Sequence, residues 1–157
     1  MRNFTMSVIF TAICASSAGA ASPPEAVLAN TSWYSLDVFD KLDNLTPAKR
    51  AELQQCRHPA YTFLMVGDKL AKRAPGFETV YSKVNVTTVG TDTRFELYWT
   101  PAPGVESSKP NEVFVLRQDG EVLMNPSMIM DTGALKCKSV ASPLPAIVAK
   151  PNYGPRR

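Results

Sequence analysis

Short runs of alternating apolar and polar residues follow one another along the chain from Pro59 onward. Within residues 94–99, Phe95, Leu97 and Trp99 fall on one face of an extended strand, and the residues between them fall on the other. This alternation is typical of an antiparallel strand with one buried and one solvated face. It predicts a mainly β protein.

Turn-forming residues separate the strand candidates at hairpin spacing. They are Gly67-Asp68, Gly90-Thr91-Asp92, Asp119-Gly120 and Gly133. Between the first two of these turns, residues 80–86 are predicted to form one continuous strand. We therefore expect a small antiparallel meander that closes into a barrel or folds as a sandwich.

One short helix is predicted near residues 47–57. Thr46 is suited to the N-cap, Pro47 to the first helical position, and Pro59 ends the segment. Its few apolar positions indicate an amphipathic helix at the periphery of the sheet rather than the centre of a helical bundle.

The first twenty residues have the features of a cleavable secretory signal peptide. Arg2 provides the positive charge, residues 4–14 form an apolar run too short to span a bilayer, and residues 18–20 form a small-residue cleavage site. The expected organisation is a signal peptide at 1–20, a leader at 21–30, a β-barrel-like domain at 31–141 and a Pro-rich, disordered tail at 142–157. The expected location is periplasmic or secreted, with no transmembrane span after signal removal. Three Asn-X-Ser/Thr sites would carry glycans only in a eukaryotic cell.

Two cysteines, Cys56 and Cys137, remain once the signal peptide and its Cys14 are removed. An even pair in an exported chain predicts one disulfide. The alternative is a reactive thiol, because Cys56 lies two positions from His58, the only histidine. Residues two apart in a helix do not face each other, which favours the disulfide.

Charge and metal-ligand patterns argue against two classes of partner. The formal net charge is +3, and the basic residues are dispersed except for Lys69, Lys72 and Arg73 and the final Arg156-Arg157. Nucleic-acid binding needs a clustered basic face, so no nucleic-acid partner is expected. The single histidine and the lack of carboxylates at ligand spacing predict no metal site, and no cofactor is expected.

Residues 128–134, an apolar run that leads into Asp131-Thr132-Gly133-Ala134, resemble the active-site loop of retroviral-type and pepsin-type aspartic proteases. In that chemistry two carboxylates share a proton and activate a water molecule. A strand that runs into a turn explains the same residues equally well. A hydrolase that uses Asp131 is kept as an alternative, and no residue is assigned as catalytic.

Trp33 opens the first strand candidate, and residues 30–34 around it resemble the Gly-x-Trp opening of lipocalins. With the all-β meander and a disulfide to the late chain, the sequence resembles lipocalin-like small β-barrel exported proteins. The resemblance implies a small apolar ligand inside the barrel. Large rings are suited to such a pocket, and the predicted ligand-binding residues are Trp33, Tyr61, Tyr98 and Trp99.

The function expected from these features is that of an exported, non-enzymatic binding protein of the cell envelope, which holds a small apolar ligand or a protein partner. The lack of a credible nucleophile, base or metal set is the main reason. One alternative is an inhibitor or immunity protein that acts on another enzyme through a loop such as residues 101–110. The other is the aspartic-type hydrolase.

Overall fold

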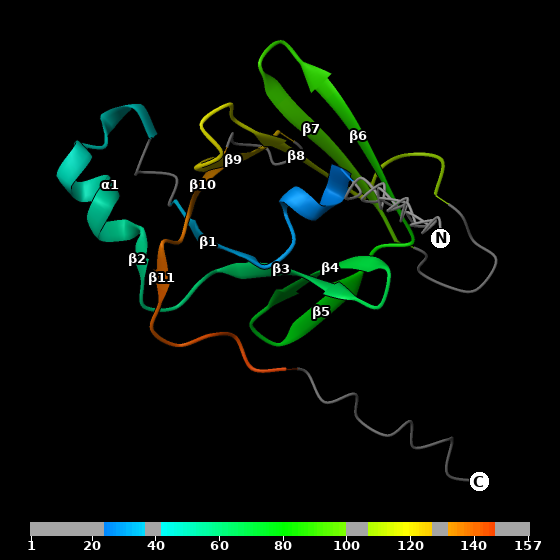
Figure 1. Ribbon diagram of the computed structural model, residues 1–157, viewed down its shortest axis with the longest axis horizontal. Coiled ribbons are helices and arrows are strands. Elements are labelled where there is room, and N and C mark those ends of the chain that lie inside the picture. The colour runs from blue at the N-terminus through cyan, green and yellow to red at the C-terminus, as the bar shows by residue number, and fades with distance from the viewer. Residues whose placement is uncertain (1–23, 37–41, 100–106, 127–131, 147–157) are drawn as a thin grey trace, which may run out of the picture.

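The computed structural model describes residues 24–36, 42–99, 107–126 and 132–146, and the fold is mainly β (Figure 1). Nine strands form the main sheet: β1 (Thr31–Ser35), β3 (Tyr61–Val66), β4 (Lys69–Ala74), β5 (Phe77–Val80), β6 (Lys83–Val89), β7 (Asp92–Tyr98), β8 (Glu112–Leu116), β9 (Val122–Asn125) and β10 (Thr132–Lys136). The remaining elements are η1 (Pro24–Val27), η2 (Leu42–Asn44), α1 (Pro47–Leu53), β2 (Gln55–Cys56) and β11 (Ser139–Val140).

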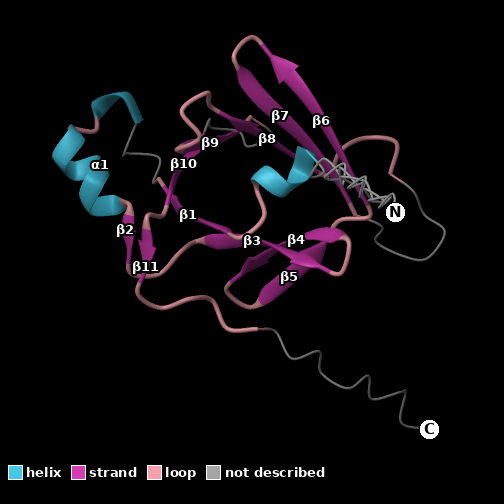
Figure 2. Cartoon of the chain, in the orientation of Figure 1, coloured by secondary structure: helices cyan, strands magenta, loops and turns pink. Residues whose placement is uncertain are grey.

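The strand order of the main sheet is β5-β4-β3-β1-β10-β9-β8-β7-β6, and all neighbouring strands are antiparallel. In this order β1 lies between β3 and β10, the last strand of the main sheet along the chain. The order is therefore that of an up-and-down barrel opened between β5 and β6. The sheet curls into a half-barrel, which Figure 2 shows edge-on. The predicted mainly β antiparallel fold with one short helix is confirmed.

The two edge strands, β5 and β6, are consecutive in the chain and are connected by Tyr81 and Ser82. The Tyr81 N–H donates to the Leu70 carbonyl of β4 at 2.9 Å, and the Ser82 N–H donates to the Tyr98 carbonyl of β7 at 2.8 Å. The prediction of one continuous strand over residues 80–86 is therefore wrong. The chain bends because Tyr81 is buried in the core while its neighbours continue into opposite edges of the sheet.

The concave side of the sheet holds the main hydrophobic core. Its buried residues alternate along the strands, as expected when one face of each strand points inward. They are Leu28, Trp33, Phe63, Leu70, Tyr81, Phe95, Leu97, Phe114, Leu116, Leu123 and Ala134.

The segment before β1 belongs to this core, although residues 21–30 were predicted to be a leader outside the domain. Pro24–Val27 forms the 3-10 helix η1, and Leu28, which follows it, is completely buried. The Thr31 hydroxyl donates to the Leu28 carbonyl, and the Trp33 Nε1–H donates to the Thr31 hydroxyl at 2.8 Å. These contacts attach the N-terminal segment to β1.

The helix α1 packs on the convex side of the sheet. The Thr46 hydroxyl accepts from the Lys49 N–H at 3.2 Å, which is the predicted N-cap. The helix ends at Leu53 rather than near residue 57, because Gln55–Cys56 pairs with Ser139–Val140 in a parallel two-stranded sheet. A second apolar cluster joins this region to the main sheet through Leu36, Val122 and Leu135, with Tyr34, Leu42, Leu45, Leu53 and Met124 around them.

The predicted disulfide is confirmed. Cys56 and Cys137 are bonded, with their Cα atoms 5.5 Å apart. Because Cys137 directly follows β10, the bond ties β2 and the end of α1 to the centre of the main sheet. This bond closes a loop with a sequence separation of 81.

Gly133 lies inside β10, and the prediction that it turns the chain is wrong. A Cβ atom at this position would lie 3.3 Å from the Met124 sulfur and 3.5 Å from Leu36 Cδ1. Glycine is therefore suited here to close packing on the convex face rather than to a turn.

Some predictions fall outside the described residues. They concern the signal peptide at 1–20, Asp131 and most of the Pro-rich tail. Within the part of the chain that the structure describes, no helix has the length and apolar character needed to cross a membrane.

Candidate ligand-binding cavity

A cavity of about 340 Å³ opens into the concave side of the half-barrel. This volume falls within the range of small-molecule sites, which are mostly about 300–1,000 Å³. Most of the side chains around it are apolar. The lining residues are Ser35, Ala60, Tyr61, Lys72, Ala74, Pro75, Phe77, Phe114, Asn125, Gly133 and Ala134.

The two-residue period of the strands aims these side chains inward. Tyr61 of β3 lies opposite Trp33 of β1, and Ala74 of β4 lies opposite Phe77 of β5. Each pair has one buried member and one that borders the cavity or its rim. The sheet alternation therefore places most strand residues of the cavity wall on the concave face.

Aromatic rings from opposite walls of the half-barrel meet beside the cavity. Phe63 and Phe114 make an edge contact with ring centroids 5.5 Å apart, and Tyr61 lies 5.7 Å from Phe63 and 6.1 Å from Phe114. In the sheet order, β1, β10 and β9 separate β3 from β8. The rings therefore touch across the lumen, and they form a rigid apolar wall.

A buried ion pair also crosses the lumen. The Lys72 ammonium of β4 contacts both carboxylate oxygens of Glu112 on β8, at 2.5 Å for Oε1. The Tyr81 hydroxyl donates to Glu112 Oε2 at 3.2 Å. Only 12% of the Lys72 side chain and 18% of the Glu112 side chain are exposed. The carboxylate is thus held from two sides, and Lys72 is one of the residues that line the cavity.

The surroundings of Lys72 are aromatic. Its Nζ lies 5.9 Å from the Tyr61 ring centroid and 5.5 Å from that of Phe114, within the range of cation–π attraction. Burial, and next the negative charge of Glu112, raise the pKa values of Tyr61 and Tyr81 above the ordinary tyrosine range. Both phenols therefore stay protonated and remain hydrogen-bond donors.

The four predicted ligand-binding aromatics lie in different places. Tyr61 lines the cavity, and Trp33 is fully buried in the core beside it. Trp99 packs against the Tyr81 ring, with centroids 6.3 Å apart. Tyr98 lies on the convex face, where Lys83 Nζ is 5.3 Å from its ring centroid and its hydroxyl donates to a surface carboxylate.

Most residues of the site were not predicted, among them Lys72, Glu112 and Phe114. A signal for them is present in the strand pattern. Lys72 lies between Leu70 and Ala74 on the inward face of β4, and Glu112 shares the inward face of β8 with Phe114. A charged residue at an inward position on each of two strands indicates a buried polar site.

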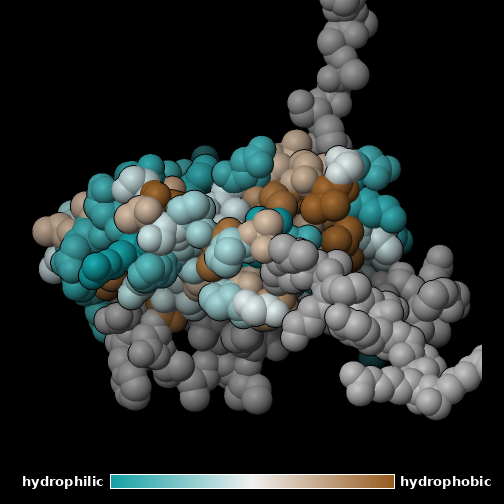
Figure 3. All heavy atoms as spheres, turned by 90° about the horizontal axis from the view of Figure 1, so that it is seen from below, coloured by the Kyte–Doolittle hydropathy of each residue, from teal (hydrophilic) through white to brown (hydrophobic). Residues whose placement is uncertain are grey.

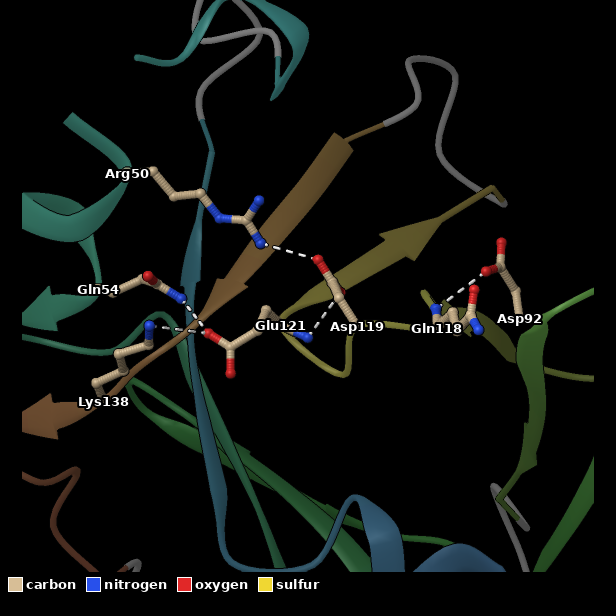
Figure 4. Close-up of polar contacts among 7 residues, drawn as sticks. All are labelled: Arg50, Gln54, Asp92, Gln118, Asp119, Glu121 and Lys138. Atoms are coloured by element: carbon tan, nitrogen blue, oxygen red, sulfur yellow. Dashed lines mark hydrogen bonds and ion pairs between the residues drawn. The ribbon is translucent and has the colours of Figure 1, made fainter. Parts of the chain in front are cut away.

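Polar contacts hold the turn between β8 and β9 against α1 (Figure 4). Arg50 contacts Asp119 at 3.0 Å, and the Gln54 side chain donates to Glu121 at 2.5 Å. Lys138 also contacts Glu121, at 3.5 Å. Because Asp119 and Glu121 belong to the turn between β8 and β9, these contacts anchor that turn to the helix and to the segment after β10.

Asp119 of this turn has a shifted pKa. Burial by itself would raise the pKa of Asp119, but the Glu121 N–H and the Arg50 guanidinium outweigh that effect and lower the pKa. The Glu121 N–H donates to the Asp119 carboxylate at 2.9 Å. The ionised carboxylate therefore holds the β8–β9 turn in place.

Several apolar side chains on β3 and β5 are exposed. Phe77, which lines the cavity, is 51% exposed. Val66 of β3 and Val80 of β5 are also exposed, but they lie on the convex face, because Val80 pairs with Ala71 whereas Phe77 pairs with the cavity residue Ala74. Figure 3, seen from below, shows apolar surface over the part of the molecule where β3, β4 and β5 lie in Figure 1. Because Phe77 both lines the cavity and is exposed, the cavity opens to solvent beside the edge strand β5.

The described residues contain no group of three His, Cys, Asp or Glu side chains placed to hold a metal ion. No protein-family model, curated protein or solved structure matches the chain.

Proposed function

We propose that this chain is an exported, non-enzymatic binding protein that holds a small, mainly apolar ligand in the half-barrel. The observation that carries the proposal is the cavity of about 340 Å³, walled by Tyr61, Phe77 and Phe114, with a single ammonium group at Lys72. An apolar cavity with a few placed polar groups is the usual form of a small-molecule site.

The disulfide supports the exported location. Disulfides form and persist in the periplasm and outside the cell, and they are rare in the cytosol. The Cys56–Cys137 bond therefore fits a periplasmic or secreted protein.

A protein partner is the second candidate occupant. The edge strand β5, which pairs only with β4 among the described strands, carries the exposed Phe77 and Val80. A strand edge without a partner is able to accept a further strand. A partner of this kind would cover the cavity mouth instead of filling the cavity.

Binding of an apolar fluorescent dye tests the leading proposal. We expect saturable binding to the oxidised protein and displacement by small apolar molecules. Ala74→Phe places a ring in the cavity and should weaken dye binding at least about tenfold, which corresponds to about 1.4 kcal/mol. Ala51→Phe, on the exposed side of α1, is the matched control and should leave dye binding unchanged.

Two results would refute the ligand-binding proposal. One is a lack of saturable dye binding to the wild-type protein. The other is equal dye affinity of the wild type and a folded Ala74→Phe variant, because the dye would then bind elsewhere on the surface.

A further inference from the structure

The charge of the cavity is balanced before any ligand enters. Lys72 is the only charged residue among the described residues that line it. Its ammonium is paired with the Glu112 carboxylate, which is also held by the Tyr81 hydroxyl. The ion pair is largely buried, so water screens it little. The site therefore carries one positive and one negative charge and no net charge.

One hydrogen-bond donor of Lys72 remains for a ligand. An ammonium group has three N–H donors. Two of them face the two oxygens of Glu112, and the Tyr61 and Phe114 rings flank the group. Among the described residues, no further acceptor bonds to Lys72. Its third N–H is therefore free to donate to an oxygen atom inside the cavity.

A ligand with its own charge fits this site poorly. It would place an uncompensated charge among apolar side chains, which is strongly unfavourable. A carboxylate would also compete with Glu112 for the same ammonium, and a cation would be repelled by Lys72. A neutral hydroxyl or carbonyl oxygen accepts the third N–H without disturbing the ion pair.

Given the proposed function, on which this step rests, we infer that the cavity selects an uncharged amphiphile. The ligand has an apolar body, which packs against Tyr61, Phe77 and Phe114, and one neutral oxygen, which accepts a hydrogen bond from Lys72. Glu112 determines this choice without lining the cavity, because it sets the net charge of the site. It is thus a specificity residue that acts through Lys72.

Isothermal titration calorimetry with three probes of equal chain length tests the inference. The probes are 1-octanol, octanoate and octylamine, titrated into the oxidised full chain at neutral pH. We expect 1-octanol to bind at least about tenfold more tightly than either ionised probe. Glu112→Gln leaves the charge of Lys72 unbalanced, so octanoate should gain at least about tenfold and bind more tightly than 1-octanol.

Glu78→Gln is the matched control. Glu78 is the ion-pair partner of Arg73, with Oε2 2.7 Å from Nε, and the pair lies on the convex face of β4 and β5. The control removes the same kind of carboxylate close to the site but outside the cavity. The order of the three affinities should be the same as in the wild type.

The possible outcomes separate this inference from the proposed function. Octanoate binding as tight as 1-octanol in the wild type, or an unchanged order of affinities in Glu112→Gln, overturns the inference and leaves ligand binding intact. Failure of all three probes and of the apolar dye refutes both. If Glu112→Gln does not fold, the double variant Lys72→Met/Glu112→Met replaces it. In the double variant we expect 1-octanol to bind about tenfold more weakly than in the wild type, and unchanged 1-octanol binding overturns the inference.

Discussion

Lys72 and Glu112 form an ion pair across the lumen, although β3, β1, β10 and β9 lie between their strands in the sheet order. Only the curl of the sheet brings the two side chains together. The pair therefore does two things. It braces the walls of the half-barrel against each other, and it sets the charge of the cavity.

Removal of one partner of this ion pair should destabilise the protein strongly. Lys72→Met leaves the Glu112 carboxylate buried with only the Tyr81 hydroxyl as a donor, and we expect a loss of about 3 kcal/mol in the free energy of unfolding. The double variant Lys72→Met/Glu112→Met leaves no buried charge and should be clearly more stable than Lys72→Met. Urea denaturation of both variants measures this. A double variant as unstable as Lys72→Met would contradict a bracing ion pair.

The Cys56–Cys137 disulfide should supply a large part of the stability. The bond closes a loop with a sequence separation of 81, and a loop of this size is worth about 4 kcal/mol in the chain-entropy model. Reduction should therefore lower the urea midpoint of the wild type. A Cys56→Ser/Cys137→Ser variant should match the reduced wild type and show no response to reductant. If reductant still lowers the urea midpoint of this variant, the stabilisation does not come from the Cys56–Cys137 bond.

Leu28 should behave as a core residue despite its position before the first strand. Its side chain is completely buried, so Leu28→Ala should cost about 2–4 kcal/mol. The neighbouring Val27 is 53% exposed, and Val27→Ala should change stability by less than about 0.5 kcal/mol. Thermal unfolding of the two variants makes the comparison. Equal, small effects would place the N-terminal segment outside the folded unit.

The contribution of Asp119 should depend on pH. Because its pKa is lower in the folded protein, the ionised carboxylate adds stability above the unfolded-state pKa, and this contribution is lost as the pH falls through the folded-state pKa. Asp119→Asn should therefore be less stable than the wild type at pH 7, by less than about 1 kcal/mol because the contact with Arg50 is exposed. The difference should shrink below about pH 4. A difference that grows in acid would contradict the sign of this shift.

Much of the fold follows from local sequence signals. Alternation in residues 94–99 placed Phe95 and Leu97 in the core, and the capping signals at Thr46 and Pro47 began the helix where it begins. The disulfide followed from an even cysteine count. The predictions that were wrong depend on distant contacts, because the bend at Tyr81 and the tight packing at Gly133 are set by other strands.

Fewer residues of the site could be predicted from the sequence, for the same reason. Tyr61 was predicted as one of four large rings suited to a ligand pocket, and it borders the cavity. The residues that set the charge of the cavity, Lys72 and Glu112, lie 40 positions apart, and their pairing depends on how far the sheet curls. Period-two alternation gives the inward direction of each side chain, but it does not give the distance between opposite walls.

Native mass spectrometry of the oxidised protein, purified from the cell that produces it, tests the central claim most directly. A small bound mass should accompany the wild-type chain and be lost from Ala74→Phe, and the chain should be two hydrogens lighter than its reduced form. A wild-type chain that carries no bound mass, and that retains no added 1-octanol, would contradict a ligand-binding half-barrel.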